Sequence, residues 1–503
     1  MMEYYQLGGF QPQIQWFHST YDDKRLVEAV VSTLRSGDDR NRPLELVLGI
    51  KRCGTSHLLL TDAQMRRVRL QMRLPLPRSP PFTVHDFESL SPIEFSGVEE
   101  LSKKLSFLKP KAKKRSVNPN QPDSSQANRG YNVHEENLYR GLFEHGRVIY
   151  RILNNAIAST TYGSEDLSWA GNIRVSAFVF NTRGVDDRPR ADRVRYPSVL
   201  DIGFCDAQLP SLSPNYASAK HFIYTKNALL GRKEPKKPFS YGDSEQVSSE
   251  DMPIRIQHFF KEHQRNRQAP MVLLVHKEEE TMNFLDNMDV DMSQWRLGLK
   301  DLLIPEACSP RKKDIKSHSN NLRSNEPLRY NDYESRLEQP RYRSRSPKHY
   351  SASRPRDSPS SATLWRRSSY PPVYVVDVHR LYETLMQADD AKTVVSIGHR
   401  FNLTDVIGWC AGNEAGLLID IWKSMVSGVP IDDQREMRSA GRTEVKAEQE
   451  AQSSSVAPRA AIDSDEEEDP NDYVPRPDVQ KSDVPATEID YGFDVSDYGS
   501  DSD

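Results

Sequence analysis

The sequence predicts an α/β fold in which helices flank a mixed β-sheet, and three observations carry this prediction. Apolar strand patterns follow one another at 173–180, 198–205 and 221–225, with polar or turn residues between them. A continuous apolar run at 271–275 is typical of a central strand that is covered on both faces. Apolar residues at helical spacing over 132–158 predict a long amphipathic helix ahead of the first strand. Consecutive strands followed by alternating helices and strands describe a mixed sheet between helices.

The remaining elements follow from the same spacing rules. The segment 253–265 is expected to be a helix, with a proline in its first turn. His145 lies on the apolar face of the helix over 132–158, where we expect a core or boundary histidine rather than a ligand. The other expected elements are helices over 278–285, 378–386, 403–410 and 414–426, and a strand over 373–377.

The composition is too polar for one continuous globule. Of 503 residues, 36% are hydrophobic and 28% are charged, and 33 are prolines, so ordered blocks separated by disorder are expected. The net charge of −4 hides two opposite blocks: residues 309–370 carry a net charge of +9, and residues 459–503 carry −12. Opposite blocks of this kind are typical of interaction segments rather than core.

These patterns divide the chain into six parts. Within the first, a helix over 26–34 and strands over 44–50 and 58–60 fit either a small α/β unit or extensions that pack on the main domain. The long insert is tolerable because loop-closure entropy grows slowly with length. The parts are an N-terminal extension (1–108), a basic linker (109–130), the first part of the sheet domain (131–305), a disordered Arg/Ser-rich insert (306–371), the second part of the sheet domain (372–430) and a disordered acidic tail (431–503).

The cysteines and the targeting patterns indicate the cellular compartment in which we expect the protein. The four cysteines are scattered without a CxxC pair, so the spacing implies neither a zinc site nor a disulfide framework and fits a reducing compartment. No signal peptide and no apolar run of the roughly 18–20 residues needed to span a bilayer are visible, so no membrane partner is expected. The basic run Lys109–Arg115 is either a nuclear-localisation signal or a solvated charge run. We therefore expect an intracellular protein of the nucleus, the cytoplasm or both.

Four local motifs give the sheet domain a resemblance. The motifs are Phe180-Asn-Thr-Arg-Gly184, Leu200-Asp-Ile-Gly203, Val375-Val-Asp-Val378 with Leu381, and Cys410-Ala-Gly-Asn-Glu-Ala415. In their order and spacing they resemble the ribonuclease-H-like fold of DEDD-type 3′–5′ exonucleases. The branch they resemble most is the fungal family related to a suppressor of an mRNA-export helicase defect, known as good for full DEAD-box protein activity. The resemblance covers 170–305 and 372–428 and implies a ribonuclease-H-like mixed sheet.

The resemblance also implies where catalytic groups would stand. Active members hold two Mg²⁺ or Mn²⁺ ions with clustered carboxylates, because hard cations need oxygen ligands. Here the first-strand positions are Asn181 and Arg183, the middle position is Thr281, and the last is Glu414. Trp409 stands at the position of the histidine that helps to activate water, and indole cannot act as a base. One carboxylate cannot hold two metals, so we expect no catalysis and no cofactor.

An active or residual exonuclease is the alternative, with Mg²⁺ or Mn²⁺ held by Asn181, Glu280 and Glu414. Glu280 is one residue from the expected position, a rotation of about 100° around a helix that aims it elsewhere. Acidic residues at Asp186, Asp187 or 278–280 could also supply new ligands, although such residues are usually solvated. For Asp377 and Asn413 we expect turn and cap roles instead, since these residue types commonly satisfy backbone donors.

The insert and the tail suggest partners. Arginines with interleaved aromatic residues can bind phosphate and stack on unpaired bases, which predicts RNA binding; the alternative is a basic loop without a ligand. Phosphorylation at Ser346 or Ser358 would weaken such binding. In the tail, Ser464 precedes a run of acids and suits an acid-directed kinase, and the tail either binds a basic protein, competes for the insert or only solubilises the chain. The predicted RNA-binding residues are Arg183, Arg341, Tyr342, Arg343, Arg345 and Trp365.

The expected function is therefore a non-catalytic scaffold or adaptor that binds RNA. A role in mRNA export or processing is implied by the resemblance alone. Two alternatives stay open: the metal-dependent exonuclease, and a protein-interaction module that does not bind nucleic acid.

Overall fold

The computed structural model of the chain describes residues 2–9, 23–35, 42–51, 55–73, 80–108, 136–164, 167–227, 229–265, 269–304, 371–388 and 391–439. All of these belong to one compact unit, 1–441. The predictions for the linker, for the insert and for the acidic tail beyond 439 lie outside the described residues. This applies to Arg341, Tyr342, Arg343, Arg345 and Trp365, and to Ser346, Ser358 and Ser464. Residues 431–439, which the sequence assigns to the disordered tail, are helical, and Ile431 and Asp432 are buried.

A seven-stranded mixed sheet forms the centre of the main domain and confirms the predicted α/β class. Its strand order is β10-β11-β9-β5-β6-β7-β8. β5, β6 and β7 are consecutive and antiparallel, whereas β9, β11 and β10 continue the sheet in parallel and β8 runs parallel to β7. The strands are β5 (Arg174–Thr182), β6 (Val199–Gln208), β7 (Ser213–Tyr224), β8 (Ser244–Val247), β9 (Met271–Val275), β10 (Trp295–Leu297) and β11 (Val373–Asp377).

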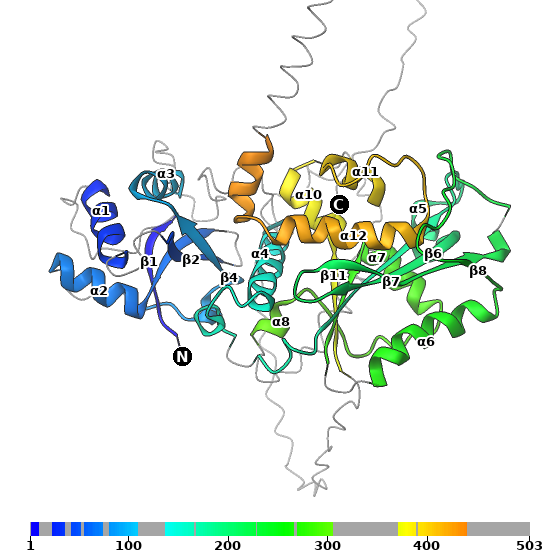
Figure 1. The fold of residues 1–503 in the computed structure, drawn as a ribbon, viewed down its shortest axis with the longest axis horizontal. Helices are drawn as coiled ribbons and strands as arrows, with labels where there is room; N and C mark the ends of the chain where they lie inside the picture. Colours follow the sequence, from blue (N-terminus) through cyan, green and yellow to red (C-terminus); the bar gives the residue numbers. More distant parts are fainter. Residues whose placement is uncertain are drawn as a thin grey trace, which may run out of the picture. The chain divides into compact units, whose positions relative to one another are not determined.

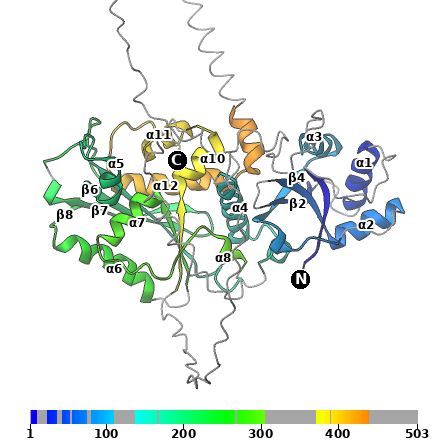
Figure 2. The ribbon, with the colours of Figure 1, turned by 180° about the vertical axis from the view of Figure 1, so that it is seen from behind.

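Helices cover both faces of this sheet, as Figures 1 and 2 show from opposite sides. Alternating residues of β5 face opposite ways: Val175 and Val179 pack with the core of α4, α10 and α12, whereas Phe178 packs with the core of α6 and α7. Every residue of β9 is buried, which confirms a central strand covered on both faces. The helices are α4 (Glu136–Leu153), α5 (Arg190–Arg195), α6 (Asp251–Arg265), α7 (Glu278–Asp286), α8 (Lys300–Leu303), α10 (Val378–Met386), α11 (Val394–Arg400) and α12 (Ala411–Val426).

The N-terminal residues form a second, four-stranded antiparallel sheet of order β1-β3-β2-β4. One face is covered by the apolar sides of its own three helices. The other face packs on α4, so this helix is shared by the N-terminal sheet and the main domain. The elements are β1 (Tyr4–Gly9), α1 (Asp23–Leu34), β2 (Leu44–Ile50), β3 (Ser56–Thr61), α2 (Asp62–Met72), β4 (Ser89–Phe95) and α3 (Val98–Leu108).

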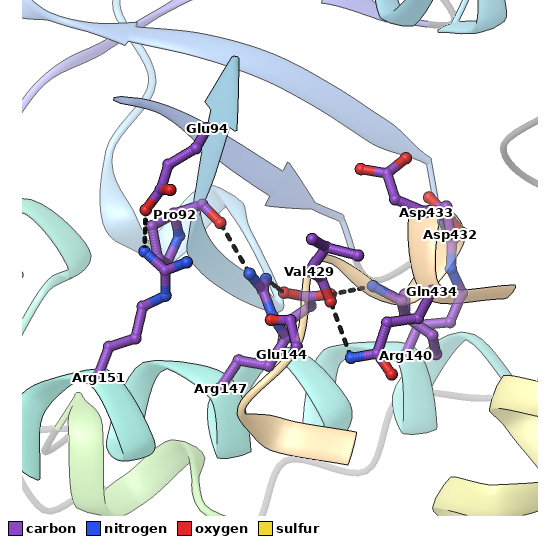
Figure 3. Close-up of polar contacts among 12 residues, drawn as sticks. Pro92, Glu94, Arg140, Glu144, Arg147, Arg151, Val429, Asp432, Asp433 and Gln434 are labelled. Atoms are coloured by element: carbon purple, nitrogen blue, oxygen red, sulfur yellow. Dashed lines mark hydrogen bonds and ion pairs between the residues drawn. The ribbon is translucent and has the colours of Figure 1, made fainter. Parts of the chain in front are cut away.

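Buried charges of α4 line its contact with the N-terminal sheet (Figure 3). The guanidinium of Arg140 donates to both carboxylate oxygens of Asp432, at 3.0 and 2.9 Å, and to Ser56 at 2.7 Å. The side chains of Arg140 and Asp432 are 0% and 2% exposed. His145 is also buried here, with Nε2 2.9 Å from the carbonyl oxygen of Glu88, and burial lowers its pKa to about 4. His145 is therefore a neutral core histidine.

A second buried pair on α4, Glu144 with Arg147, reaches the turn after α12. Arg147 donates to Glu144 and to the carbonyl oxygens of Gly428 (3.0 Å) and Pro92 (3.2 Å). Glu144 accepts a hydrogen bond from the backbone N–H of Ile431 at 2.8 Å. We call the side chains of Arg140, Glu144, Arg147 and Asp432 the α4 ion-pair interface. The interface joins the N-terminal sheet, α4 and the residues after α12, which are far apart in the sequence.

The predicted helix over 403–410 is wrong. The helix lies earlier, at α11, where the side chain of Thr393 caps its N-terminus, and the chain leaves it through Asn402 with a φ of 54°. Residues 403–410 form an irregular segment in which Gly408 has a φ of 130°, a conformation that favours glycine. Its spaced apolar residues do not mark a buried face, because Val406 and Ile407 are exposed.

Two short edge strands, β8 and β10, were not predicted, since each offers at most two apolar residues to a strand pattern. Within the described residues, none of the helices has the length and apolar character that a membrane span requires.

Candidate functional site

Asn181 and Glu414, the first and last positions of the motif resemblance, meet in the structure. Asn181 stands near the end of β5 and Glu414 in the first turn of α12, and both side chains are buried. The amide Nδ2 of Asn181 donates to Oε1 of Glu414 at 3.0 Å. The same oxygen accepts from the backbone N–H of Cys410 at 3.0 Å, so Glu414 also caps its own helix.

Arg232, which the sequence analysis did not single out, completes this group. It lies in the connection between β7 and β8, and its guanidinium donates to Oδ1 of Asn181 at 2.5 Å. The backbone N–H of Gly184 donates to the carbonyl oxygen of Gly231, which joins this connection to the end of β5. A Cβ on Gly184 would lie 3.0 Å from the Cα of Arg232, so any larger residue would require the two segments to move apart by a few tenths of an ångström. We call Arg232, Asn181 and Glu414 the guanidinium site.

The electrostatics of the guanidinium site favour a partly protonated carboxyl group. Burial, helped by the nearby charge of Asp201, raises the pKa of Glu414 to about 7. The hydrogen bonds from Asn181 and Cys410 and the charge of Arg232 oppose this rise without cancelling it. Near neutral pH the carboxyl group therefore exists in both protonation states.

Metal ions of the kind that the resemblance implies do not fit these residues. The hydroxyl of Thr281, at the middle position, is buried and donates to the carbonyl oxygen of Lys277 at 2.6 Å within its own helix. Glu280 forms an ion pair with the side chain of Lys277 at 3.3 Å. The guanidinium of Arg232 already supplies a positive charge at Asn181, and Glu414 is the single carboxylate of the group. Two hard cations require more carboxylates than this.

Asp186 and Asp377, two further acidic residues near the site, have structural partners. Asp186 accepts two hydrogen bonds from the guanidinium of Arg188, at 2.9 and 2.6 Å. Asp377 caps two helices, since its carboxylate accepts from the backbone N–H groups of Glu278 (2.8 Å) and Arg380 (3.0 Å). This matches the cap role expected for it, and its pKa is raised to about 7, chiefly by desolvation.

Asn413 and Trp409 hold the connection between β7 and β8 against α12. The amide of Asn413 accepts from the N–H of Ser240 and donates to the carbonyl oxygen of Pro238, each at 2.9 Å. The indole N–H of Trp409 donates to the carbonyl oxygen of Glu234 at 3.0 Å, and the ammonium of Lys236 lies 5.4 Å from its ring centroid. At the position where the resemblance expects a water-activating histidine, the chain therefore has a buried anchor for this connection.

Beside the guanidinium site lies a second buried polar group, formed by Asp201 of β6, His221 of β7 and Cys410 at the start of α12. Nε2 of His221 is 2.8 Å from Oδ2 of Asp201 and 3.8 Å from Sγ of Cys410. A Cys-His-Asp catalytic triad needs the cysteine and the aspartate on different ring nitrogens, whereas here both face Nε2. Burial also raises the pKa of the Cys410 thiol to about 11, which removes its nucleophilic form. The group is therefore not arranged as a hydrolytic triad.

Exposed basic residues border the guanidinium site. Residues 183–196 carry five arginines against three aspartates, and residues 226–237 carry five lysines and arginines against one glutamate. The two segments are joined at Gly184 and Gly231. Arg183 is half-buried directly after β5, while Lys226, Lys233 and Lys236 are exposed. We call these two segments the basic rim; its second segment was not predicted from the sequence, because only the folded chain brings it beside the first.

No protein-family model, curated protein or solved structure matches this chain. The function must therefore be argued from the geometry of the site and from the resemblance of its motifs.

Proposed function

We propose that this chain is a non-catalytic, ribonuclease-H-like scaffold that binds single-stranded RNA along the basic rim. The observation that carries the proposal is the hydrogen bond from Arg232 to Asn181. It puts a guanidinium beside the residue that stands, by the motif resemblance, at a metal-binding carboxylate position. A fixed cation there neutralises the site without supplying a metal-activated water.

The topology and the motif positions support the ribonuclease-H-like part of the proposal. Three consecutive antiparallel strands are followed by strands that join in parallel through helices, which is the arrangement expected from the resemblance. The contact between Asn181 and Glu414 supports the motif alignment, because residues 233 positions apart in sequence meet as that alignment requires.

The basic rim supports the RNA-binding part. Lysine and arginine side chains beside a non-catalytic site can bind the phosphate groups of RNA without cleavage of the RNA. Phosphate contacts of this kind release counterions, so the affinity must fall as the salt concentration rises. The tie to mRNA export or processing rests on the family resemblance alone.

The test is a titration of fluorescently labelled single-stranded RNA with the full chain at several salt concentrations, followed by anisotropy. We expect the logarithm of the affinity to fall linearly with the logarithm of the salt concentration. The double variant Lys226→Glu/Lys233→Glu should weaken binding and reduce this slope by about two, one for each phosphate contact removed. The matched control is Arg67→Glu/Lys261→Glu, which changes the net charge equally at exposed positions outside the rim and should leave the slope unchanged.

Two outcomes would contradict the proposal. Salt-independent or absent RNA binding would favour the protein-interaction module. Shortened RNA products in the presence of Mn²⁺, lost in Glu414→Gln, would show an active exonuclease and remove the non-catalytic part.

A further inference from the structure

The group of Asp201, His221 and Cys410 combines three kinds of metal-ligand side chain in one buried place. Its carboxylate, imidazole and thiol ligand atoms all lie within 4.8 Å of one another. Asp201 lies on β6, His221 lies on β7 and Cys410 directly precedes α12, so the sheet and the start of a helix hold the three residues. A Cβ on Gly203 would lie 1.9 Å from the carbonyl oxygen of Ala411, and glycine at this position is what lets the helix start approach β6 so closely.

The hydrogen bonds of the group leave part of it unsatisfied. Nδ1 of His221 lies 2.8 Å from the hydroxyl of Ser244, which fixes the ring and turns Nε2 inward. Oδ2 of Asp201 accepts from the backbone N–H of Ala411 at 3.0 Å. Oδ1 of Asp201 is fully buried and has no hydrogen-bond partner in the part of the chain that the structure describes. A buried carboxylate oxygen without a partner is costly, so this carboxylate keeps acceptor capacity that a cation bound through both of its oxygens would use.

The donor set selects the class of cation. Thiolate, imidazole and carboxylate together are ligands for Zn²⁺, whereas Mg²⁺ and Ca²⁺ take oxygen ligands alone. One thiolate and one carboxylate balance the two charges of the ion, and the hydroxyl of Ser244 orients the imidazole as partners of metal-bound histidines do.

The spacing of the ligand atoms is compatible with this ion. Zinc bond lengths of about 2.0–2.3 Å in tetrahedral geometry separate neighbouring ligand atoms by about 3.3–3.6 Å. The observed separations from Nε2 of His221 are 2.8 Å to Oδ2 of Asp201 and 3.8 Å to Sγ of Cys410, on either side of that range. The third separation, between the ligand atoms of Asp201 and Cys410, is within 4.8 Å, so zinc binding requires these two side chains to move toward a common centre.

We propose that Asp201, His221 and Cys410 bind a zinc ion that fastens the start of α12 to β6 and β7. Sequence spacing alone did not imply this site, because its ligands are spread over 210 positions in three elements. Its role is structural: zinc binding stabilises the position of α12 and with it the position of Glu414. Asp201 and Cys410 lie in two of the quoted motifs, but none of the three ligands stands at the carboxylate positions of the resemblance, and the proposal does not depend on RNA binding.

The test is the zinc content of the full chain, purified without a histidine tag from zinc-supplemented cells and measured by mass spectrometry. We expect close to one zinc ion per chain in the wild type, with strong loss in Cys410→Ala and in His221→Ala. The matched control is Cys205→Ala, which removes the other buried free cysteine and should keep the zinc. Circular dichroism of each variant establishes that it is folded.

Cobalt substitution gives a readout that does not depend on the variants being stable. Refolding the wild type with Co²⁺ should produce the near-ultraviolet charge-transfer absorption of a cobalt–thiolate bond, and the conservative variant Cys410→Ser should lack it. If the wild type refolded with Co²⁺ shows no such absorption, the proposal is overturned. Full zinc retention in Cys410→Ala and His221→Ala would also overturn it, because the ion would then be bound elsewhere.

Discussion

The α4 ion-pair interface and the guanidinium site both contain an arginine, yet the partners of the two arginines differ in burial and in charge. At the interface, Arg140 faces the carboxylate of Asp432 and Arg147 faces that of Glu144, so each cation has an anionic partner. At the guanidinium site, Arg232 donates to a neutral amide and pairs with the exposed carboxylate of Glu234 at 3.6 Å, while the buried carboxyl group of Glu414 beyond the amide has a pKa of about 7. The first arrangement is matched in charge and serves to join elements. The second keeps an adjustable charge, which is characteristic of functional positions.

The largest expected effect comes from breaking the interface. Arg140→Ala leaves Asp432 as a buried carboxylate without its main partner, and removal of one member of a buried pair costs about 3–5 kcal/mol. The measurement is the free energy of unfolding from urea titration. The control is Lys103→Ala at the exposed pair with Glu436, where solvent screening leaves little stability to lose.

A double replacement sharpens this test. Arg140→Met/Asp432→Leu removes both charges, so the expected loss is smaller than in Arg140→Ala. Equal losses in the two variants would show that packing, and not the uncompensated charge, determines the cost.

Breaking the guanidinium site should have a smaller effect. Arg232→Ala leaves Oδ1 of Asn181 without this donor in a buried place, at an expected cost of about 1–3 kcal/mol in the free energy of unfolding. The neighbouring exposed variant Lys233→Ala should change it by less than about 0.5 kcal/mol. If the two variants behave alike, the contact between Arg232 and Asn181 contributes nothing to stability.

The adjustable charge of Glu414 predicts a pH effect of definite sign. Its pKa rises from 4.5 to about 7 on folding, so between these values the folded state binds more protons than the unfolded state. The contribution of Glu414 to stability is therefore greatest below pH 4.5 and is lost as the pH rises to about 7. The full change is on the order of 3 kcal/mol.

The measurement compares the wild type with Glu414→Gln across this pH range. Glu414→Gln has no carboxyl group to titrate at this position. The free energy of unfolding of the variant minus that of the wild type should therefore increase as the pH rises. The exposed variant Glu436→Gln should show no such trend. A constant difference between wild type and Glu414→Gln would mean that the carboxyl group has a normal pKa.

The smallest expected effect concerns the anchor of the β7–β8 connection. Trp409→Phe removes the indole hydrogen bond to Glu234 and keeps most of the packing, at a cost of about 0.5–1.5 kcal/mol. We expect faster limited proteolysis within residues 229–238, followed by mass spectrometry of the fragments. Cleavage at the wild-type rate would show that the indole hydrogen bond does not hold this connection.

The sequence predicted those helices and strands in which burial gives the apolar residues a regular spacing. The strands β5, β6, β9 and β11 and the helices α4, α6, α7, α10 and α12 all appear where apolar spacing placed them. The predicted helix over 403–410 was wrong because apolar residues at helical spacing can also lie on an irregular segment. Asn402 and Gly408 have positive φ angles, which interrupt a helix.

The site was predictable only in part. Asn181 and Glu414 were found through motifs that carry their own spacing. Arg232 reaches Asn181 through a loop contact, and His221 reaches Asp201 of the Leu200-Asp-Ile-Gly203 motif through strand pairing, and no local pattern records either contact. Partners of this kind depend on tertiary structure, and single-sequence reasoning has no signal for them.

The pairing of Arg140 with Asp432 has a consequence for how the protein is made. The two residues are 292 positions apart, so at about 5–20 residues per second the ribosome synthesises Arg140 about 15–60 seconds before its partner. During that time the N-terminal sheet and α4 exist without the residues that neutralise the charge between them. The two sheets can therefore be joined at this ion pair only after α12 and the residues that directly follow it have been synthesised.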